Sequence, residues 1–209
     1  MALVDDTENA QLTRCTLQHY ESHAEAFWQG TSDHDVSRNV NTLLARLAVD
    51  GPASILDLGC GPGRDLIEFR RRGHTAIGLD GCEAFARHAR AASSCEVWCR
   101  NFLDMALPLE NFDGVFANAS LFHVPSGEIS RVLRELHGCL RPAGVLLSSN
   151  PRGDDEEGLN GERYGAYYRE ETWRRLAGAA GFEEIESYYR PEGLPRERQP
   201  WWVSAWRKC

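Results

Sequence analysis

From residue 53 onward, short apolar runs alternate with longer amphipathic segments along the chain. Most of the apolar runs contain β-branched or aromatic residues, and several end in Asn or Asp, which is typical of strands. Between them apolar residues recur at a spacing of three or four, as in Ile129, Leu133, Leu136 and Leu140. That spacing predicts helices. The alternation predicts an α/β fold in which crossover helices cover a sheet.

The pattern predicts a seven-stranded, mostly parallel sheet, with strands at 54–58, 74–80, 95–99, 112–118, 145–150, 185–189 and 201–206. Helices are expected at 64–72, 83–92, 126–140 and 170–180. The last two strands are joined by PEGLPRERQP, which is too short and too rich in proline for a crossover helix. We therefore expect the last strand to pair antiparallel.

No linker rich in Pro, Gly or Ser divides the 209 residues, so a single domain, 1–209, is expected. Residues 1–50 are expected to form a helical cap or lid, and residues 51–209 a Rossmann-like core. Asp35 and Ser37 are both plausible N-caps for the helix VSRNVNTLLARL.

Composition narrows the classes of partner. The formal net charge of −8 argues against a nucleic acid or an anionic membrane, because binding phosphate draws on clustered Lys and Arg. The 7 cysteines form no CxxC pair, and an odd number suits a reducing compartment, so a cytoplasmic protein is expected. MALVDDTENA has neither the basic nor the apolar part of a secretory signal, and no apolar run is long enough to span a membrane. His19 and His23 have no third ligand nearby, so no metal site is expected.

A polar stretch, SSNPRGDDEEGLNGERY (148–164), directly follows the apolar run 145–147. In open α/β sheets ligands bind outside the carboxyl ends of the strands. The stretch is therefore interpreted as a long loop at a binding site, and most of its acidic residues as solvated charge.

The most specific motif is ILDLGCGPGRD, Ile55 to Asp65, which runs from a predicted strand into a predicted helix. Gly59, Gly61 and Gly63 let the backbone turn tightly beneath a ligand. The spacing is G-x-G-x-G, and Arg64 stands where a dinucleotide fold has its third glycine. A nicotinamide enzyme is therefore disfavoured.

This stretch resembles the first motif of class I S-adenosylmethionine-dependent methyltransferases. The resemblance implies that Asp57 and the glycine loop face the methionine part of the cofactor, and that Asp80 accepts hydrogen bonds from the ribose hydroxyls. Many members place an Asp beside the adenine, whereas this chain reads Asn101-Phe102-Leu103-Asp104. The implied cofactor residues are Asp57, Gly59, Gly61, Gly63, Asp80, Gly81, Asn101, Phe102, Leu103 and Asn118.

The segment NASLFHVP, 118–125, stands where that family lines the space beside the transferred methyl group. Ala119 and Ser120 replace the prolines of the D/N-P-P-Y/F motif, which disfavours amino groups of bases and of glutamine as acceptors. His123 is either a base or substrate partner, or a half-buried histidine at a helix entry. Both readings stay open.

Four stretches, 27–39, 116–126, 148–165 and 188–201, resemble more narrowly the methyltransferase domain of the bifunctional ovothiol-biosynthesis enzyme. That family methylates 5-thiohistidine on the ring nitrogen nearer the side chain. The resemblance implies catalytic roles for His123, Asp33 and Asp35, and a substrate pocket of Tyr20, Phe27, His34, Asn118, His123, Asn150, Arg152, Tyr164, Tyr168 and Arg190. Arg152 is expected to pair with the substrate carboxylate through its planar guanidinium.

The same resemblance implies that an upstream sulfoxide synthase and a lyase supply the thiohistidine. Nothing in the sequence indicates physical contact with them. Two other functions remain open at this stage: S-methylation of a thiol or selenol, and non-catalytic binding of S-adenosylmethionine.

Overall fold

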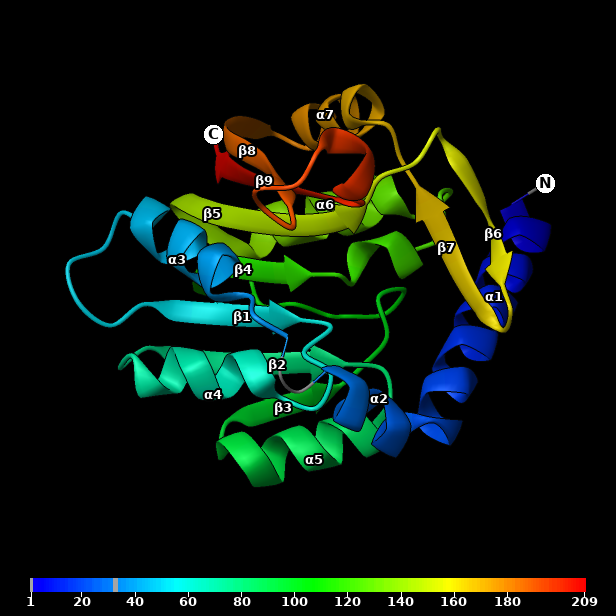
Figure 1. Ribbon diagram of the computed structural model, residues 1–209, viewed down its shortest axis with the longest axis horizontal. Coiled ribbons are helices and arrows are strands. Elements are labelled where there is room, and N and C mark those ends of the chain that lie inside the picture. Colours follow the sequence, from blue (N-terminus) through cyan, green and yellow to red (C-terminus); the bar gives the residue numbers. More distant parts are fainter. Residues whose placement is uncertain (1, 32–33) are drawn as a thin grey trace.

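The computed structural model describes residues 2–31 and 34–209, and its centre is one seven-stranded sheet of order β3-β2-β1-β4-β5-β9-β8 (Figure 1). The strands are β1 Ser54–Leu58, β2 Thr75–Asp80, β3 Glu96–Cys99, β4 Phe112–Asn118, β5 Leu140–Pro151, β8 Phe182–Arg190 and β9 Trp201–Lys208. The pairs among β1 to β5 are parallel, and β9 runs antiparallel to both of its neighbours. The predicted fold class and the antiparallel last strand are confirmed.

Helices cover both faces of this sheet. On one face lie α3 Ser37–Arg46, α4 Arg64–Arg71 and α5 Glu83–Ser93, which pack through residues such as Leu43, Leu66 and Ala89. On the other face lie α6 Ile129–Cys139 and α7 Glu170–Ala179, which pack through Leu133 and Trp173. Because successive strand residues point to opposite faces, the alternating side chains of β1 and β5 contribute to both cores.

The N-terminal fifty residues do not act as one unit. The helices α1 Ala2–Ser22 and α2 Ala24–Thr31 stand beside the carboxyl ends of the strands (Figure 1). By contrast, α3 lies on the sheet, with Val40 and Leu43 fully buried. The N-cap of α3 is Val36 rather than Asp35 or Ser37. The Asp35 carboxylate nevertheless accepts the backbone N–H of Ser37 at 2.9 Å, so it still satisfies the start of the helix.

The polar stretch after β5 is not the irregular loop that its composition predicts. It forms an antiparallel hairpin of β6 Glu156–Asn160 and β7 Arg163–Tyr167, separate from the main sheet. Figure 1 shows this hairpin beside α1, beyond the arrowheads of β1 and β4. The prediction was wrong because β6 is exposed throughout and carries no apolar alternation, whereas β7 has its buried residues Tyr164, Gly165 and Ala166 in succession.

Two further boundaries differ from prediction. The helix expected at 126–140 begins at Ile129, because residues 126–128 form a turn in which the Ser126 N–H donates to the Tyr164 hydroxyl. Leu140 belongs to β5 and pairs with Phe112 across an irregularity in the ladder. Within the described ranges, no helix is long and apolar enough to cross a membrane.

Candidate active site

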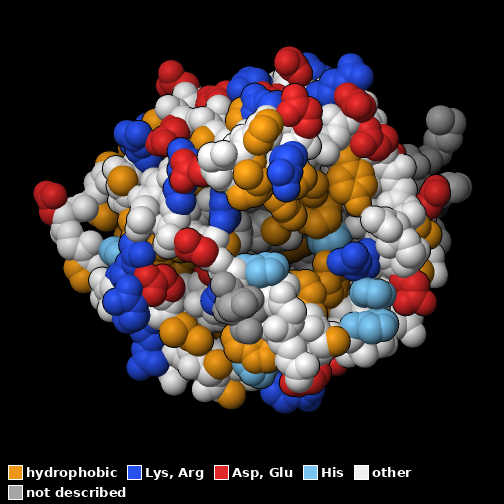
Figure 2. Space-filling model, in the orientation of Figure 1, with side chains coloured by type: hydrophobic (Ala, Val, Ile, Leu, Met, Phe, Trp, Pro, Cys, Tyr) orange, Lys and Arg blue, Asp and Glu red, His pale blue; other side chains and the backbone are white. Residues whose placement is uncertain are grey.

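A cavity of about 590 Å³ opens at the carboxyl ends of β1, β2 and β4, between the sheet and α1 and α2. Figure 2 shows the hollow near the middle of this face, with hydrophobic side chains around it and histidine and arginine side chains at its edge. Its volume lies within the range of small-molecule sites. Thirteen of the predicted residues line it: Tyr20, Phe27, His34, Asp35, Gly59, Gly61, Asp80, Gly81, Asn101, Phe102, Asn118, His123 and Arg190.

The glycine loop forms the floor of the cavity for steric reasons. Gly59 has a φ of 73°, and a Cβ there would lie 2.4 Å from the Cβ of Ser120. Gly61 has a φ of 52° and open space where its Cβ would be. Any larger residue at Gly59 would push the β4 segment away, and a side chain at Gly61 would adopt a strained backbone. The loop therefore brings bare backbone against the cavity.

Gly63 serves a different purpose from the one predicted. It does not line the cavity, and a Cβ there would lie 2.9 Å from the Cα of Ala89 in α5. It permits close packing of α4 and α5 instead of contact with a ligand.

Asp80, at the end of β2, projects into the cavity. Its Oδ2 accepts the Gly61 N–H at 2.8 Å and its Oδ1 accepts the Cys82 N–H at 2.9 Å. Each carboxylate oxygen can accept more than one hydrogen bond, so both retain capacity for a ligand hydroxyl. Burial raises the pKa of Asp80 to about 6, against the lowering effect of the two N–H donors.

Asp57, at the carboxyl end of β1, lies behind the loop and does not line the cavity. Its side chain is buried, and its Oδ2 has no hydrogen-bond partner among the described residues. Burial and then the neighbouring Asp65 raise the pKa of Asp57 well above its usual range. An unpaired carboxylate oxygen beneath a glycine loop is suited to a cationic group or a water above it.

The segment after β3 forms the side wall. Asn101 and Phe102 line the cavity, and the Asn101 Oδ1 accepts the Leu103 N–H at 2.8 Å. That bond leaves the Asn101 amide NH₂ as a free donor. Leu103 itself does not line the cavity, so its contribution is the backbone N–H that orients Asn101.

Asn118, at the end of β4, is held by a residue that the sequence interpretation missed. Its Oδ1 accepts from the Nδ2 of Asn39 at 2.9 Å, and the Oδ1 of Asn39 accepts the Tyr188 hydroxyl at 2.9 Å. Asn39 is fully buried on the face of α3 that also carries Val40 and Leu43. A polar residue on the apolar face of a predicted helix was the available signal.

His123 follows β4 in the 3₁₀ turn Leu121–His123, and two partners fix its ring. Its Nδ1 lies 2.6 Å from the Tyr164 carbonyl and its Nε2 lies 2.8 Å from the Tyr20 hydroxyl. The carbonyl can only accept, so Nδ1 carries the proton and the Tyr20 hydroxyl donates to Nε2. Burial lowers the pKa of His123 to about 4, and burial raises that of Tyr20. The pair is therefore neutral, with the Tyr20 oxygen still able to accept.

The rim near α2 and β8 carries the remaining predicted groups. The Arg190 guanidinium donates to the Asp35 carbonyl, and both residues line the cavity with His34. Asp33 lies outside the described residues. Arg64 is a second residue that the sequence interpretation missed. It pairs with Asp65 at 2.8 Å and donates to the Thr31 carbonyl at the end of α2, which ties this helix to the glycine loop.

Four predicted substrate residues do not reach this cavity. Tyr164 contributes only its backbone, since its hydroxyl bonds to Glu157 and Ser126. Asn150, Arg152 and Tyr168 lie at a separate cavity over α7. The Arg152 guanidinium donates there to the carbonyls of Arg196 and Gln199. This position does not support its expected pairing with a carboxylate beside the cofactor. Side chains alternate along β5, so Ser149 faces the first cavity, whereas Asn150 lies with Arg152 at the second.

Residues 55–144 match the family model of a methyltransferase domain. The chain is 36% identical over 122 residues to trans-aconitate 2-methyltransferase of Azoarcus sp. (strain BH72), covering 57% of this chain and 47% of that protein. It is 32% identical over 185 residues to the enzyme of the same name from Acidovorax sp. (strain JS42), covering 84% and 69%. The chain spans about half the length of the first curated relatives it matches. These names differ from the ovothiol resemblance, which stays a prediction.

Among solved structures, the Burkholderia thailandensis 1,6-didemethyltoxoflavin-N1-methyltransferase superposes with a TM-score of 0.79 at 23% sequence identity, covering 96% of this chain and 90% of that one. That protein was crystallised with 1,6-didemethyltoxoflavin and S-adenosylhomocysteine. The likeness extends over nearly the whole fold, including the N-terminal helices.

Proposed function

The chain belongs to the class I S-adenosylmethionine-dependent methyltransferase family, and from that premise we propose that it methylates the side-chain-proximal ring nitrogen of 5-thiohistidine. The arrangement of Tyr20 and His123 in the cavity is the observation that carries the proposal, because methylation at nitrogen needs a proton acceptor that methylation at a thiolate does not. The cofactor supplies an electrophilic methyl group on a sulfonium.

The residues present fit this cofactor. Asp80 offers two oxygens with unused lone pairs to the ribose hydroxyls, and Gly61 leaves open space above the loop. The unpaired oxygen of Asp57 is available to the methionine ammonium through water, and the Asn101 amide to the adenine edge. Asp57, Gly61, Asp80 and Asn101 would thus hold the cofactor.

For the amino-acid part of the substrate, Arg190 takes the role that the sequence assigned to Arg152. Its guanidinium lies on the cavity wall and the Asp35 carbonyl engages only part of its donor set. The remaining N–H groups can bind a carboxylate as a fork. Asn118 and His34 complete the polar part of the wall.

The proton is handled by the Tyr20–His123 pair. The imidazole ring of a thiohistidine cannot attack while both nitrogens carry protons, so one proton must leave. The Tyr20 oxygen accepts it while the Tyr20 proton moves to His123 Nε2, which is already hydrogen-bonded. Because burial lowers the pKa of His123 to about 4, the ring holds this proton only transiently and returns it through Tyr20 when the cavity opens to solvent. His123 thus acts through Tyr20.

Position, not reactivity, must select nitrogen over sulfur. A thiolate is intrinsically the better nucleophile, so the cavity must hold the ring nitrogen in line with the methyl group at ~3–3.5 Å and turn the sulfur away. The rings of Tyr20 and Phe27, with centroids 5.4 Å apart and planes nearly perpendicular, form an aromatic corner against which the substrate ring packs under this proposal.

The names of the relatives favour a second candidate, O-methylation of a small polycarboxylate such as trans-aconitate. Arg190 could bind a carboxylate in either reaction, so the two candidates differ in the acceptor atom. The Tyr20–His123 pair favours the nitrogen acceptor, because a carboxylate is already deprotonated at neutral pH.

The test is product analysis with the full chain and S-adenosylmethionine carrying a ¹³C methyl group. With 5-thiohistidine we expect an N-methyl signal that correlates with the ring by NMR, and Arg190→Ala should raise KM more than it lowers kcat. S-methyl product alone would refute the proposal. Turnover of trans-aconitate without turnover of 5-thiohistidine would establish the second candidate.

A further inference from the structure

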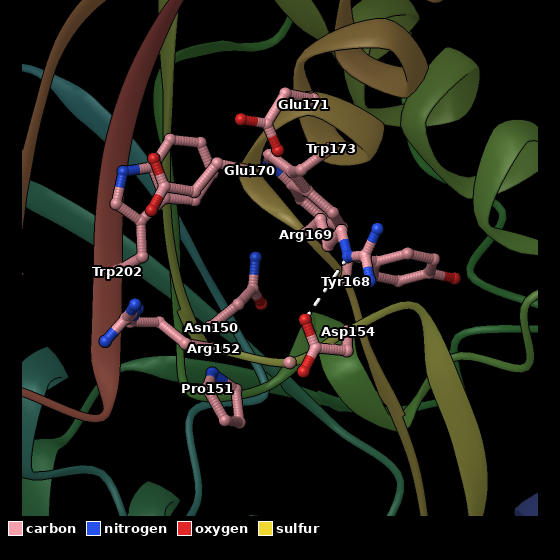
Figure 3. A pocket seen from close by; sticks show the side chains of 11 residues that line it. Asn150, Pro151, Arg152, Asp154, Tyr168, Arg169, Glu170, Glu171, Trp173 and Trp202 are labelled. Atoms are coloured by element: carbon pink, nitrogen blue, oxygen red, sulfur yellow. Dashed lines mark hydrogen bonds and ion pairs between the residues drawn. The ribbon is translucent and has the colours of Figure 1, made fainter. Parts of the chain in front are cut away.

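A second cavity, of about 210 Å³, lies between β5, β9 and α7 and is lined by Asn150, Trp173 and Trp202 among others (Figure 3). It is separate from the cavity of about 590 Å³ that we propose holds the cofactor, called the cofactor cavity or first cavity below. Ser149 and Trp201 line the first cavity, while their chain neighbours Asn150 and Trp202 line the second. Since successive strand residues face opposite sides of a sheet, the sheet divides the two spaces.

The second cavity holds polar side chains that are buried without partners. Asn150 is 5% exposed, and neither its Nδ2 nor its Oδ1 has a hydrogen-bond partner in the part of the chain that the structure describes. The indole Nε1 atoms of Trp173 and Trp202, which are 1% and 3% exposed, are equally unpaired. Figure 3 shows the Asn150 amide near the centre of the side chains drawn, below Trp202 and Trp173 in this view. Leaving such buried groups unpaired is energetically costly, so a bound partner is expected.

The chemistry of that partner follows from the donors and the charges. The Asn150 amide, the two indoles and the Tyr168 hydroxyl, which is also buried and unpaired among the described residues, offer five donor hydrogens and only two acceptor atoms, the Asn150 and Tyr168 oxygens. A ligand must therefore bring acceptor atoms, as a carboxylate does. At the mouth, Glu171 is exposed and has no ion-pair partner in residues 2–31 and 34–209, whereas Asp154 is paired with Arg169 at 3.2 Å. A free carboxylate at the mouth suits a cation.

We infer that this second cavity binds a zwitterionic α-amino acid, with its carboxylate on the Asn150 amide and the indole N–H groups and its ammonium toward Glu171. A ligand that carries only the carboxylate or only the ammonium group fits the cavity less well. A simple anion leaves Glu171 unmatched, and a simple cation leaves the interior N–H groups unpaired and meets Arg152 and Arg169, which also line the cavity. The site lies away from the transferred methyl group, so it is a separate binding site and not a part of the catalytic one.

The experiment follows the indole N–H signals of Trp173 and Trp202 in the ¹⁵N-labelled full chain, assigned with Trp173→Phe and Trp202→Phe. The probes are L-alanine and L-histidine, with propionate and ethylamine as the isolated poles. Both amino acids should shift these two signals saturably, with a Kd of roughly 1 mM or below, and each isolated pole should bind at least about tenfold more weakly.

Two variants sharpen the result. Asn150→Leu keeps the shape of the side chain and should abolish the shifts, while S-adenosylmethionine binding in the other cavity, measured by calorimetry, is retained. Glu171→Gln lies at the surface and should weaken the amino acids about threefold without affecting propionate. Absence of shifts with both amino acids, equal binding of propionate, or unchanged binding by Asn150→Leu would each overturn the inference. None of these readouts involves methyl transfer, so the proposed reaction can fail independently.

Discussion

The sheet separates the two cavities, and the cavities differ in how their central polar side chains are held. In the first cavity three polar side chains are already held by the protein, namely Asp80 by two backbone N–H groups, Asn118 by Asn39, and His123 by Tyr20 and Tyr164, whereas the hydroxyls of Thr13 and Ser120 have no partner among the described residues. In the second cavity, Asn150, Trp173 and Trp202 have no such partners within residues 2–31 and 34–209. A site whose groups are fixed in advance is arranged for chemistry, because groups held in place need little reorganisation during reaction. A site with unpaired groups is completed only by its ligand.

The largest effect should come from removing the carboxylate that is central to the first cavity. Asp80→Ala removes the acceptor of two ribose hydroxyls, each a hydrogen bond to a charged group, so affinity for S-adenosylmethionine should fall at least ~100-fold. Calorimetry measures this directly. Affinity within threefold of the parent would show that the ribose lies elsewhere.

The next effect tests the buried support of that cavity. Asn39→Leu leaves the Asn118 oxygen and the Tyr188 hydroxyl without their partner, so the free energy of unfolding should fall by about 2–4 kcal/mol. Asn41→Leu, on the exposed side of the same helix, removes only a solvent-exposed hydrogen bond from Arg72 and should change it by less than ~0.5 kcal/mol. Urea unfolding compares the two variants, and equal effects would mean that the buried network contributes nothing.

The pH dependence of cofactor binding should report the state of Asp80. Its pKa in the free protein is raised to about 6, and only the ionised form accepts hydrogen bonds from both hydroxyls. Affinity should therefore rise as the pH rises through 6, and be about tenfold weaker at pH 5 than at pH 8. In Asp80→Asn this dependence should disappear. A flat profile in the parent protein would contradict the assignment.

The Tyr20–His123 pair should affect turnover and not cofactor binding. Tyr20→Phe removes both the acceptor oxygen and the proton that His123 receives, so kcat should fall about tenfold or more while the Kd of S-adenosylmethionine stays within twofold. Tyr167→Phe, on the neighbouring hairpin, serves as the matched control. Equal losses in kcat and affinity would indicate a structural role for Tyr20 instead.

The smallest effect has the opposite sign. Without a ligand, Asn150→Leu replaces an unpaired buried amide by an apolar side chain of similar shape, and should stabilise the fold by about 1 kcal/mol. Thermal unfolding should show a Tm above that of the parent protein. Destabilisation similar to that of Asn39→Leu would erase the distinction between the two cavities.

The cofactor half of the site was predictable from the sequence because local spacing determines it. The glycine loop follows β1 and Asp80 ends β2, and the carboxyl ends of these two parallel strands must meet at one edge of the sheet. The prediction also included three residues that lie near the cavity without lining it: Asp57, Gly63 and Leu103.

The substrate half was less predictable because it depends on strand parity and on distant contacts. Moving one residue along β5 changes the cavity that a side chain faces, and the sequence gives no marker that separates Ser149 from Asn150. Likewise, nothing near Asn118 in the chain indicates that Asn39 binds it, or that the exposed run after β5 pairs into a hairpin against α1.

The hydrogen bonds that fix His123 also make turnover depend on α1 lying against the β6–β7 hairpin beside the first cavity. Tyr20 belongs to α1 and the carbonyl of Tyr164 to the hairpin, and the two segments are joined where the Tyr164 N–H donates to the Thr16 hydroxyl at 2.9 Å and where His19 meets Glu162 at 3.2 Å. If α1 withdraws to admit a substrate or release a product, Tyr20 leaves His123 and the proton relay comes apart. Under the proposed mechanism, bond making is then confined to the shut state, and an activated methyl group is not exposed to bulk water while the relay is assembled.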